Sequence, residues 1–215
     1  MSGPAHGRFI SFEGGEGAGK STQIKRLAAS LRQRGLDVLE TREPGGTPGA
    51  EAIRTLVLEG ATDRWDAMTE ALLFYAARRD HVERVIRPAL ARGTWVLSDR
   101  FGDSSIVYQG AVLGAGEARV RALHELALGP FWPDLTLILD LDPALGLARA
   151  HARDGEGAYR YERMAGDIHE AMRAAFLALA AREPARCLVI DAQGASEDVA
   201  AAVLAAVRKR LLKAM

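Results

Sequence analysis

The sequence predicts an α/β fold in which helices cover both faces of a five-stranded parallel sheet. Five short apolar segments alternate with segments of helical periodicity along the 215 residues. One of them, LTLILDL at 135–141, is apolar almost throughout, as expected of a strand buried on both faces. A glycine-rich loop joins the first apolar segment to the first helix. Strands that alternate with helices in this way favour a doubly wound sheet with right-handed crossovers.

The strands and the first helices follow from the apolar pattern. The five strands are expected at residues 9–13, 37–41, 94–99, 135–141 and 187–191. A long helix with one mostly apolar face is predicted over 67–92. Before it, a helix is predicted over 21–34, where apolar residues recur at helical spacing at Ile24, Leu27, Ala28 and Leu31.

The second half of the chain supplies two helix starts and one irregular segment. Asp142 is expected to cap a helix that has Pro143 at its first position, and Ser196 is expected to cap the last helix. Residues 149–163, RAHARDGEGAYRYER, are charged and contain glycines, so they are predicted to form an exposed loop between two helices and a candidate lid. The last helix would bury Val199, Val203, Leu204, Val207 and Leu211.

Composition indicates one domain of an ordinary globular enzyme, spanning 1–215 with a loose tail at 1–8. The 28 basic residues balance 28 acidic ones, which disfavours nucleic acid and anionic membranes as partners but leaves room for a local cationic pocket. The single cysteine, Cys187, lies in an apolar run and is expected to be buried, in a reducing compartment. Neither a secretory signal nor a run of about 18 apolar residues is visible, so a cytoplasmic location is expected.

The segment GGEGAGKS at 14–21 fits the phosphate-loop pattern G-x-x-x-x-G-K-[ST] at every fixed position. It follows an apolar strand and opens a helix, which is the placement that the motif requires. Its backbone N–H groups and the helix N-terminus would hold the phosphates of a nucleoside triphosphate. Lys20 would bridge the outer phosphates, and Ser21 would bind Mg²⁺ through its hydroxyl. The predicted ATP site comprises Gly14, Gly15, Glu16, Gly17, Ala18, Gly19, Lys20, Ser21 and Thr22.

The phosphate loop alone does not identify the reaction, because motors, switches, transporters and kinases all use it. The chain lacks the N-K-x-D segment with which a regulatory GTPase reads its base. Strand ends elsewhere supply groups for a second ligand. Arg100, after the third strand, is placed to bind a phosphate, and Asp99 to hold a metal-bound water or to orient Arg100. Phe74 and Arg78 are spaced to share one helix face, where a ring can stack on a base.

Taken together, these segments resemble the bacterial thymidylate kinase family, over nearly the whole chain from about residue 9 to residue 192. The matching segments are FEGGEGAGKST, TREPGGTPGAEAIR, LLFYAARRDHV, SDRFGDSSIVYQG, a lid with arginines, and VIDA. The phosphate loop is generic, whereas the other segments are specific in this order and spacing. The resemblance implies a P-loop nucleoside monophosphate kinase fold with a short lid, and a homodimer formed through long apolar helices such as 67–90.

The resemblance also implies the roles of residues in the acceptor site. Glu16 would contact the sugar 3′-hydroxyl of the monophosphate and the Mg²⁺ shell, while Arg54 and Arg100 would bind its phosphate. Phe74 would stack on thymine, and Arg78 would contact the edge of the base. The other residues expected to bind the acceptor are Glu43, Pro44, Ser104, Ser105, Tyr108, which would exclude a 2′-hydroxyl, and Gln109.

Members of this family differ in where the catalytic cation lies. No basic residue stands beside Glu16 in the phosphate loop, so the cation is expected from the lid arginines, foremost Arg149 and Arg153, with Arg160 also available. Lys20, Arg100 and Glu16 complete the expected catalytic set, with Ser21 and Asp99 at the metal. The sequence departs from many relatives at Ala77, where Asp is common, and at Phe101, where Tyr is usual. Both changes are expected to tune activity rather than abolish it.

The functional hypothesis is phosphoryl transfer from ATP, with Mg²⁺, to dTMP. The alternative within the same class is a kinase for dUMP, dCMP or AMP, because the sequence does not determine the size of the pocket around the thymine methyl group. A different class is a nucleotide-binding switch or scaffold, in which the acceptor residues would have no purpose. ATP, dTMP and a second copy of the chain are the expected partners, with no nucleic acid and no membrane.

Overall fold

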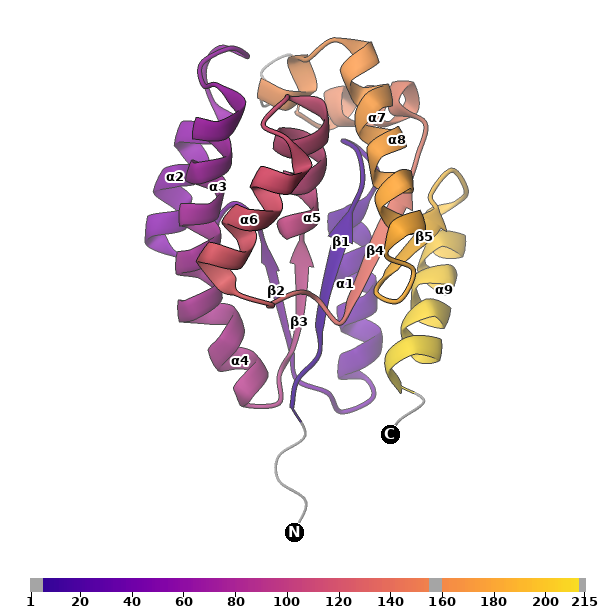
Figure 1. Cartoon of the computed structure of the whole chain (residues 1–215). Coiled ribbons are helices and arrows are strands. Elements are labelled where there is room, and N and C mark those ends of the chain that lie inside the picture. Colours follow the sequence, from indigo (N-terminus) through magenta and orange to yellow (C-terminus); the bar gives the residue numbers. More distant parts are fainter. Residues whose placement is uncertain (1–5, 155–159, 213–215) are drawn as a thin grey trace.

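The computed structural model describes residues 6–154 and 160–212, in which five parallel strands form one sheet of order β2–β3–β1–β4–β5 (Figure 1). The strands are β1 (Phe9–Glu13), β2 (Val38–Arg42), β3 (Trp95–Asp99), β4 (Leu135–Asp140) and β5 (Cys187–Asp191). All five predicted strands are confirmed, and their boundaries differ from the expected ones by at most one residue.

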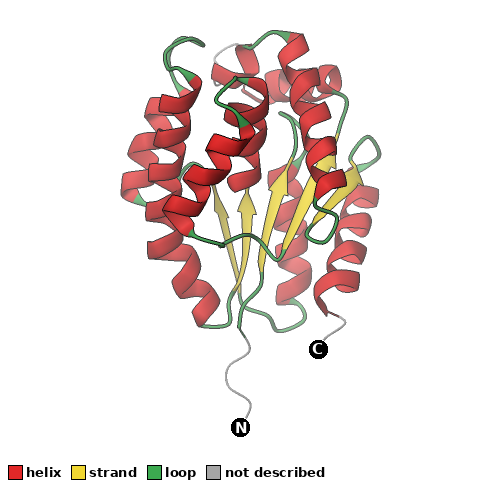
Figure 2. Ribbon diagram, viewed as in Figure 1, coloured by secondary structure: helices red, strands yellow, loops and turns green. Residues whose placement is uncertain are grey.

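Helices cover both faces of this sheet, as Figure 2 shows. They are α1 (Lys20–Arg32), α2 (Pro48–Leu58), α3 (Ala67–His81), α4 (Arg87–Ala91), α5 (Gly102–Ser105), α6 (Glu117–Leu128), α7 (Pro143–Asp154), α8 (Gly166–Arg182) and α9 (Ser196–Val207). The described residues also form four short helical turns of other types, at Val82–Ile86, Ile106–Val112, Arg160–Arg163 and Arg208–Leu212.

The central strand β1 is buried on both sides because its side chains alternate between two cores. Ile10 and Phe12 pack with α1 and α9 on one face, whereas Phe9 packs with α4 on the other. All five residues of β1 are buried, while the edge strand β2 is half-buried. Since β3 and β4 flank β1, the strand order reverses beside it, and ligands of open α/β sheets bind at the carboxyl ends of strands at such a point.

The long helix predicted over 67–92 is present as one helical run from Ala67 to Ala91 that contains a π-helical turn. Helix α3 ends at His81, the π turn follows at Val82–Ile86, and α4 continues directly from Arg87. Pro88 accounts for the change in hydrogen-bond pattern, because its missing N–H cannot bond to the carbonyl four residues earlier and its ring crowds that turn. The predicted helix is therefore confirmed, with a π turn that the apolar periodicity did not indicate.

One of the two predicted helix caps is confirmed. The Oδ1 atom of Asp142 accepts hydrogen bonds from the amides of Ala144, at 2.9 Å, and Leu145, at 3.3 Å. Ser196 is not a cap, because it is the first residue of α9 and Ala195 precedes the helix without a side-chain hydrogen bond. The Ser196 hydroxyl instead lies 3.3 Å from Gln23 Nε2 and so joins α9 to α1.

The described parts of the segment 149–163 are helical, which the sequence did not suggest. Its first residues continue α7 to Asp154, and Arg160–Arg163 forms a 3₁₀ turn in which Arg160 and Tyr161 are buried. The expectation of an exposed loop is therefore wrong for these residues, while 155–159 lie outside the described part. Cys187 is buried and unpaired, as predicted. Over residues 6–154 and 160–212, no helix has the length and apolar character needed to cross a membrane.

Candidate active site

A cavity of about 530 Å³ opens where the loops after β1, β2 and β3 meet. This volume suits a small-molecule ligand. Six basic and four acidic side chains line it, so the cavity has a cationic excess in a chain of zero net charge. The cationic pocket that the composition left room for is therefore present here.

The phosphate loop forms one wall of the cavity between β1 and α1. Gly17 has a φ of 64°, and a Cβ atom there would lie 1.9 Å from the carbonyl oxygen of Gly146 in α7, so no other residue fits. Helix α1 starts after Gly19 without a side-chain cap. Its first amide groups therefore remain available to an anion at the positive end of the helix dipole.

Lys20 lies at the base of this loop and is almost fully buried. Its ammonium group donates hydrogen bonds to the carbonyl oxygens of Gly15, at 2.7 Å, and Gly14, at 3.3 Å. Burial and the nearby charge of Arg100 hold the pKa of Lys20 below its ordinary value. The loop thus orients a point charge into the cavity, as the motif predicts.

Ser21 and Asp99 bring two oxygen ligands together at the ends of α1 and β3. The Ser21 hydroxyl donates to Asp99 Oδ2 at 2.6 Å. A hydroxyl and a carboxylate beside a triphosphate site are the donors that Mg²⁺ prefers. Among the described residues, no group of three or more His, Cys, Asp or Glu side chains could hold a metal ion. A metal at this pair would therefore depend on phosphate oxygens or water for its remaining ligands.

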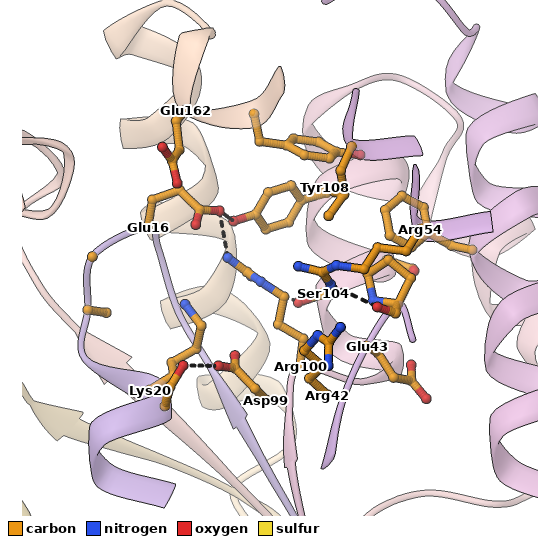
Figure 3. A pocket seen from close by; sticks show the side chains of 18 of the residues that line it. Glu16, Lys20, Arg42, Glu43, Arg54, Asp99, Arg100, Ser104, Tyr108 and Glu162 are labelled. Atoms are coloured by element: carbon orange, nitrogen blue, oxygen red, sulfur yellow. Dashed lines mark hydrogen bonds and ion pairs between the residues drawn. The ribbon is translucent and has the colours of Figure 1, made fainter. Parts of the chain in front are cut away.

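Arg100 connects the phosphate loop to the acceptor side of the cavity (Figure 3). Its Nη2 atom lies 2.6 Å from Glu16 Oε1, and its Nη1 donates to Ser104 Oγ at 3.1 Å. The Tyr108 hydroxyl donates to the same Glu16 oxygen at 3.1 Å, and the guanidinium group lies over the Tyr108 ring. Glu16, Arg100 and Tyr108, which the sequence placed together only through a resemblance, are thus one contact group.

Opposing effects set the ionisation of this group. Burial alone would raise the pKa of the Glu16 carboxyl, but the charges of Arg100 and Lys20 and the Tyr108 hydrogen bond hold that pKa below its ordinary value. Burial raises the pKa of the Tyr108 hydroxyl. Glu16 therefore stays a carboxylate and Tyr108 a neutral donor at neutral pH.

Glu13, at the end of β1, holds the loop that carries Arg100. Its Oε1 accepts the amide hydrogen of Phe101 at 2.7 Å, and its Oε2 lies 2.5 Å from Ser104 Oγ. Arg100 needs such support because its φ is 69°, the only positive value at a non-glycine residue in the described chain. Burial, and then the charge of Asp103, raises the pKa of Glu13 to about 8.

Phe74 and Arg78 share one face of α3 and line the cavity, as their spacing predicted. Arg78 is almost fully buried, and its Nε donates to Glu43 Oε2 at 2.6 Å. Its two terminal nitrogens donate to Ser105 Oγ and to the carbonyl oxygen of Phe101, both at 3.1 Å. Glu43 therefore orients Arg78 as well as lining the cavity.

The other predicted acceptor residues also line this cavity. Arg54 donates from Nη1 to the carbonyl oxygen of Pro44 at 2.8 Å. In Figure 3, Arg54 extends into the cavity from the right of the view, and Arg100 rises from below toward Glu16. Pro44, Ser104, Ser105, Tyr108, Gln109 and, in the ATP region, Thr22 are likewise lining residues.

Of the three lid arginines, the structure describes the side chains of Arg149 and Arg160. Arg149 is exposed on α7 and does not line the cavity. The side chain of Arg153, although its backbone belongs to α7, lies outside the described part of the chain. Arg160 is buried in an ion pair with Glu70 of α3.

Several residues of the site were missed by the sequence analysis. Glu70 is one of them, although it is four residues before Phe74 and eight before Arg78, a spacing that places all three on one helix face. His81, whose Nδ1 lies 3.1 Å from Glu43 Oε1, follows on the same helix. Glu13 ends an apolar strand, which is a poor position for an unpaired carboxylate.

The same chain resembles known proteins over nearly its whole length. The sequence profile of the thymidylate kinases matches residues 12–203. A thymidylate kinase of Caulobacter vibrioides is 58% identical over 205 residues, covering 95% of this chain and 98% of the relative. One of Rhizorhabdus wittichii is 54% identical, covering 93% and 96%. The crystal structure of the Ehrlichia chaffeensis thymidylate kinase superposes with a TM-score of 0.75 at 31% identity, covering 94% of this chain and 99% of that one.

Glu13 gives a prediction for stability against pH. Its folded pKa of about 8 lies above the ordinary 4.5, so unfolding releases a proton between these values and the folded state loses stability as pH rises through that window. Glu13→Gln, which stays neutral, should gain about 2–4 kcal/mol in free energy of unfolding relative to the wild type between pH 5 and pH 8. Urea unfolding at pH 5, 6.5 and 8 measures this difference.

Glu59→Gln is the control for this experiment, because Glu59 is exposed. Its pH profile should run parallel to that of the wild type. A Glu13→Gln profile that also ran parallel would show that Glu13 is ionised in the folded protein.

Proposed function

We propose that this chain, which belongs to the thymidylate kinase family, transfers the γ-phosphoryl group of ATP to the 5′-phosphate of dTMP, giving ADP and dTDP for dTTP synthesis. The observation that supports this most is that one cavity joins a phosphate loop to Arg54, Arg100, Phe74 and Arg78. A hydrolytic switch would need only the phosphate loop. The four other residues supply the phosphate-binding and stacking groups that a nucleotide acceptor requires.

The chemistry needs positioning more than proton transfer. An anionic oxygen of the acceptor phosphate attacks the γ-phosphorus, and the bond from that phosphorus to the β–γ bridging oxygen breaks, which leaves ADP. Because the attacking oxygen is already ionised, no strong general base is required. The enzyme must bring two polyanions together in line, and Lys20 on the donor side and Arg100 on the acceptor side lower that repulsion.

Mg²⁺ fits the Ser21–Asp99 pair, since a hydroxyl and a carboxylate lie 2.6 Å apart next to the phosphate loop. When bound, the ion supplies positive charge to the phosphate oxygens of ATP. Asp99 holds the Ser21 hydroxyl in place for this purpose, and Glu16 adds a carboxylate on the acceptor side.

The acceptor pocket can hold dTMP in one orientation. Arg54 and Arg100 bind the phosphate, and Glu16 accepts a hydrogen bond from the sugar 3′-hydroxyl. The Tyr108 ring, fixed by its bond to Glu16, occupies the space where a 2′-hydroxyl would lie. Phe74 stacks on the base, while Arg78, positioned by Glu43, donates to its edge. Ser104, Ser105, Pro44 and Gln109 complete the walls.

A lid arginine supplies the remaining catalytic charge in this proposal, because the phosphate loop has no basic residue beside Glu16. Arg153 and Arg149, on α7, are the candidates. Arg160 is less suited in the described conformation, since Glu70 already neutralises it.

The protein is further proposed to be a single-domain, cytoplasmic homodimer. The buried, unpaired thiol of Cys187 suits a reducing compartment. Two neighbouring helices, α3 and α6, carry the exposed leucines Leu72 and Leu126, with 52% and 85% of their surface accessible. An apolar surface of this kind suits contact with a second copy.

A panel of monophosphates tests the proposed function. In a coupled assay of ATP consumption, dTMP should give the highest kcat/KM among dTMP, dUMP, dCMP and AMP. A preference for AMP would refute the proposed acceptor. If the protein hydrolyses ATP and no monophosphate accelerates that hydrolysis, the result would favour a nucleotide-binding switch over a kinase.

Phe74→Ala should weaken dTMP binding about 10- to 100-fold, because stacking on a base contributes roughly 1–3 kcal/mol. Binding of ATP should not change. Titration calorimetry measures both, and Phe74→Tyr, which keeps a ring, should stay within a few-fold of the wild type. An unchanged dTMP affinity in Phe74→Ala would remove Phe74 from the site.

Arg153→Ala should lower kcat by about 10³-fold or more, the lower range for a catalytic cation in phosphoryl transfer, while sparing dTMP affinity. Single-turnover kinetics with dTMP measure the chemical step. Arg163, which donates to the carbonyl oxygen of Gly60 at 2.6 Å and is exposed, provides the control variant Arg163→Ala. If both variants turn over normally, the cation does not come from Arg153.

A further inference from the structure

A buried carboxylate that the sequence analysis did not select lies behind the acceptor pocket. Glu70, on α3, is only 1% exposed. Three groups point at it: the guanidinium group of Arg160, the hydroxyl of Tyr161 and the amide nitrogen of Gln109 at 2.7 Å. Gln109 Nε2 also lies 2.9 Å from the Tyr161 hydroxyl.

All three partners of Glu70 are hydrogen-bond donors. The Arg160 guanidinium is as deeply buried as Glu70 and forms an ion pair with it, so the two charges compensate each other. An ionised carboxylate has only acceptor atoms. It therefore attracts the amide nitrogen of Gln109 and repels the amide oxygen.

This requirement fixes which end of the Gln109 amide faces the ligand. Gln109 lines the cavity, and its nitrogen is turned away toward Glu70 and Tyr161. Its oxygen is then the polar atom left for the cavity. Among residues 6–154 and 160–212, no group donates a hydrogen bond to that oxygen, so it is available to a ligand.

Arg78 supplies the complementary group. Three of its five N–H groups are used by Glu43, Ser105 and the Phe101 carbonyl, and two remain. The pocket therefore presents an acceptor from Gln109 and donors from Arg78. Thymine and uracil offer the matching pair, an N–H at ring position 3 beside a carbonyl at position 4. Cytosine has these reversed, with a lone pair at position 3 and an amino group at position 4.

We propose that Glu70 is a positioning residue that holds the Gln109 amide with its oxygen toward the base, so that the pocket selects a monophosphate whose base has an N–H at ring position 3. This inference rests on the proposed function and adds a cause for its selectivity. A site built to bond an N–H rejects a ligand that lacks it more strongly than an apolar pocket can, because its own polar groups are left unpaired.

The test measures kcat/KM for dTMP and dCMP in the wild type and in Glu70→Gln. A neutral amide at position 70 can donate hydrogen bonds as well as accept them, so the side-chain amide of Gln109 can flip and exchange its nitrogen and oxygen. The ratio of the two kcat/KM values should fall at least tenfold, with a rise in the KM for dTMP and none for dCMP. Arg160→Lys, which keeps the charge on Glu70, is the matched control and should retain the wild-type ratio within about threefold.

If Glu70 had only a structural role, Glu70→Gln would lower kcat/KM for dTMP and for dCMP in proportion. The ratio of the two values would then be unchanged, which would overturn the inference. Gln109→Met, which leaves Glu70 in place, keeps the test valid if Glu70→Gln does not fold, and it too should lose at least tenfold in the ratio. An unchanged ratio there would equally refute the role. Failure of the wild type to prefer dTMP would instead refute the proposed function.

Discussion

The carboxyl group of Glu13, buried between β1 and the loop after β3, is the contact on which the rest of the site depends. It accepts a hydrogen bond from the backbone amide of Phe101 and contacts the hydroxyl of Ser104. That hydroxyl in turn accepts a hydrogen bond from Arg100. Arg100 has a left-handed backbone conformation that an arginine adopts only when its surroundings compensate the strain. With that loop fixed, the guanidinium group reaches Glu16 across the phosphate loop. The donor and acceptor halves of the cavity thus share one rigid support, and a polar group at the end of an apolar strand provides it.

The same arrangement recurs at two other buried glutamates. Glu43 orients Arg78, and Glu70 orients Gln109, each by offering acceptor atoms that only a donor can approach. In all three cases the carboxyl group supports a side chain that lines the cavity, namely Arg100, Arg78 or Gln109. Burial makes an unpaired partner costly, so each of these contacts restricts orientation more than an exposed one would. Pre-arranged groups of this kind suit a reaction whose main difficulty is to align two anions.

Local patterns in the sequence predicted much of the fold. The apolar runs gave the five strands, and Asp142 gave a helix start, because both depend on neighbouring residues only. The cap at Ser196 was wrong, and the π turn inside the 67–92 helix was not predicted, for physical reasons. A hydroxyl can cap its own helix or contact another one, and here Gln23 contacts it. Apolar periodicity does not show that Pro88 lacks the N–H of an α-helical hydrogen bond. The segment 149–163 looked exposed because its charges are visible in the sequence, but Glu70, the partner that allows Arg160 to be buried, is not.

The sequence by itself determined the phosphate loop and the parallel sheet, since motif spacing and hydrophobic periodicity are local properties, and its resemblance to a family identified many of the residues that line the second half of the cavity. Only the tertiary structure decided how those residues are held. The pairs Glu16–Arg100, Glu43–Arg78 and Glu70–Gln109 are separated by 84, 35 and 39 positions in the chain. No local pattern pairs an acceptor with a donor over such separations. Strand order brings them together, and burial then makes each polar group find the one partner within reach.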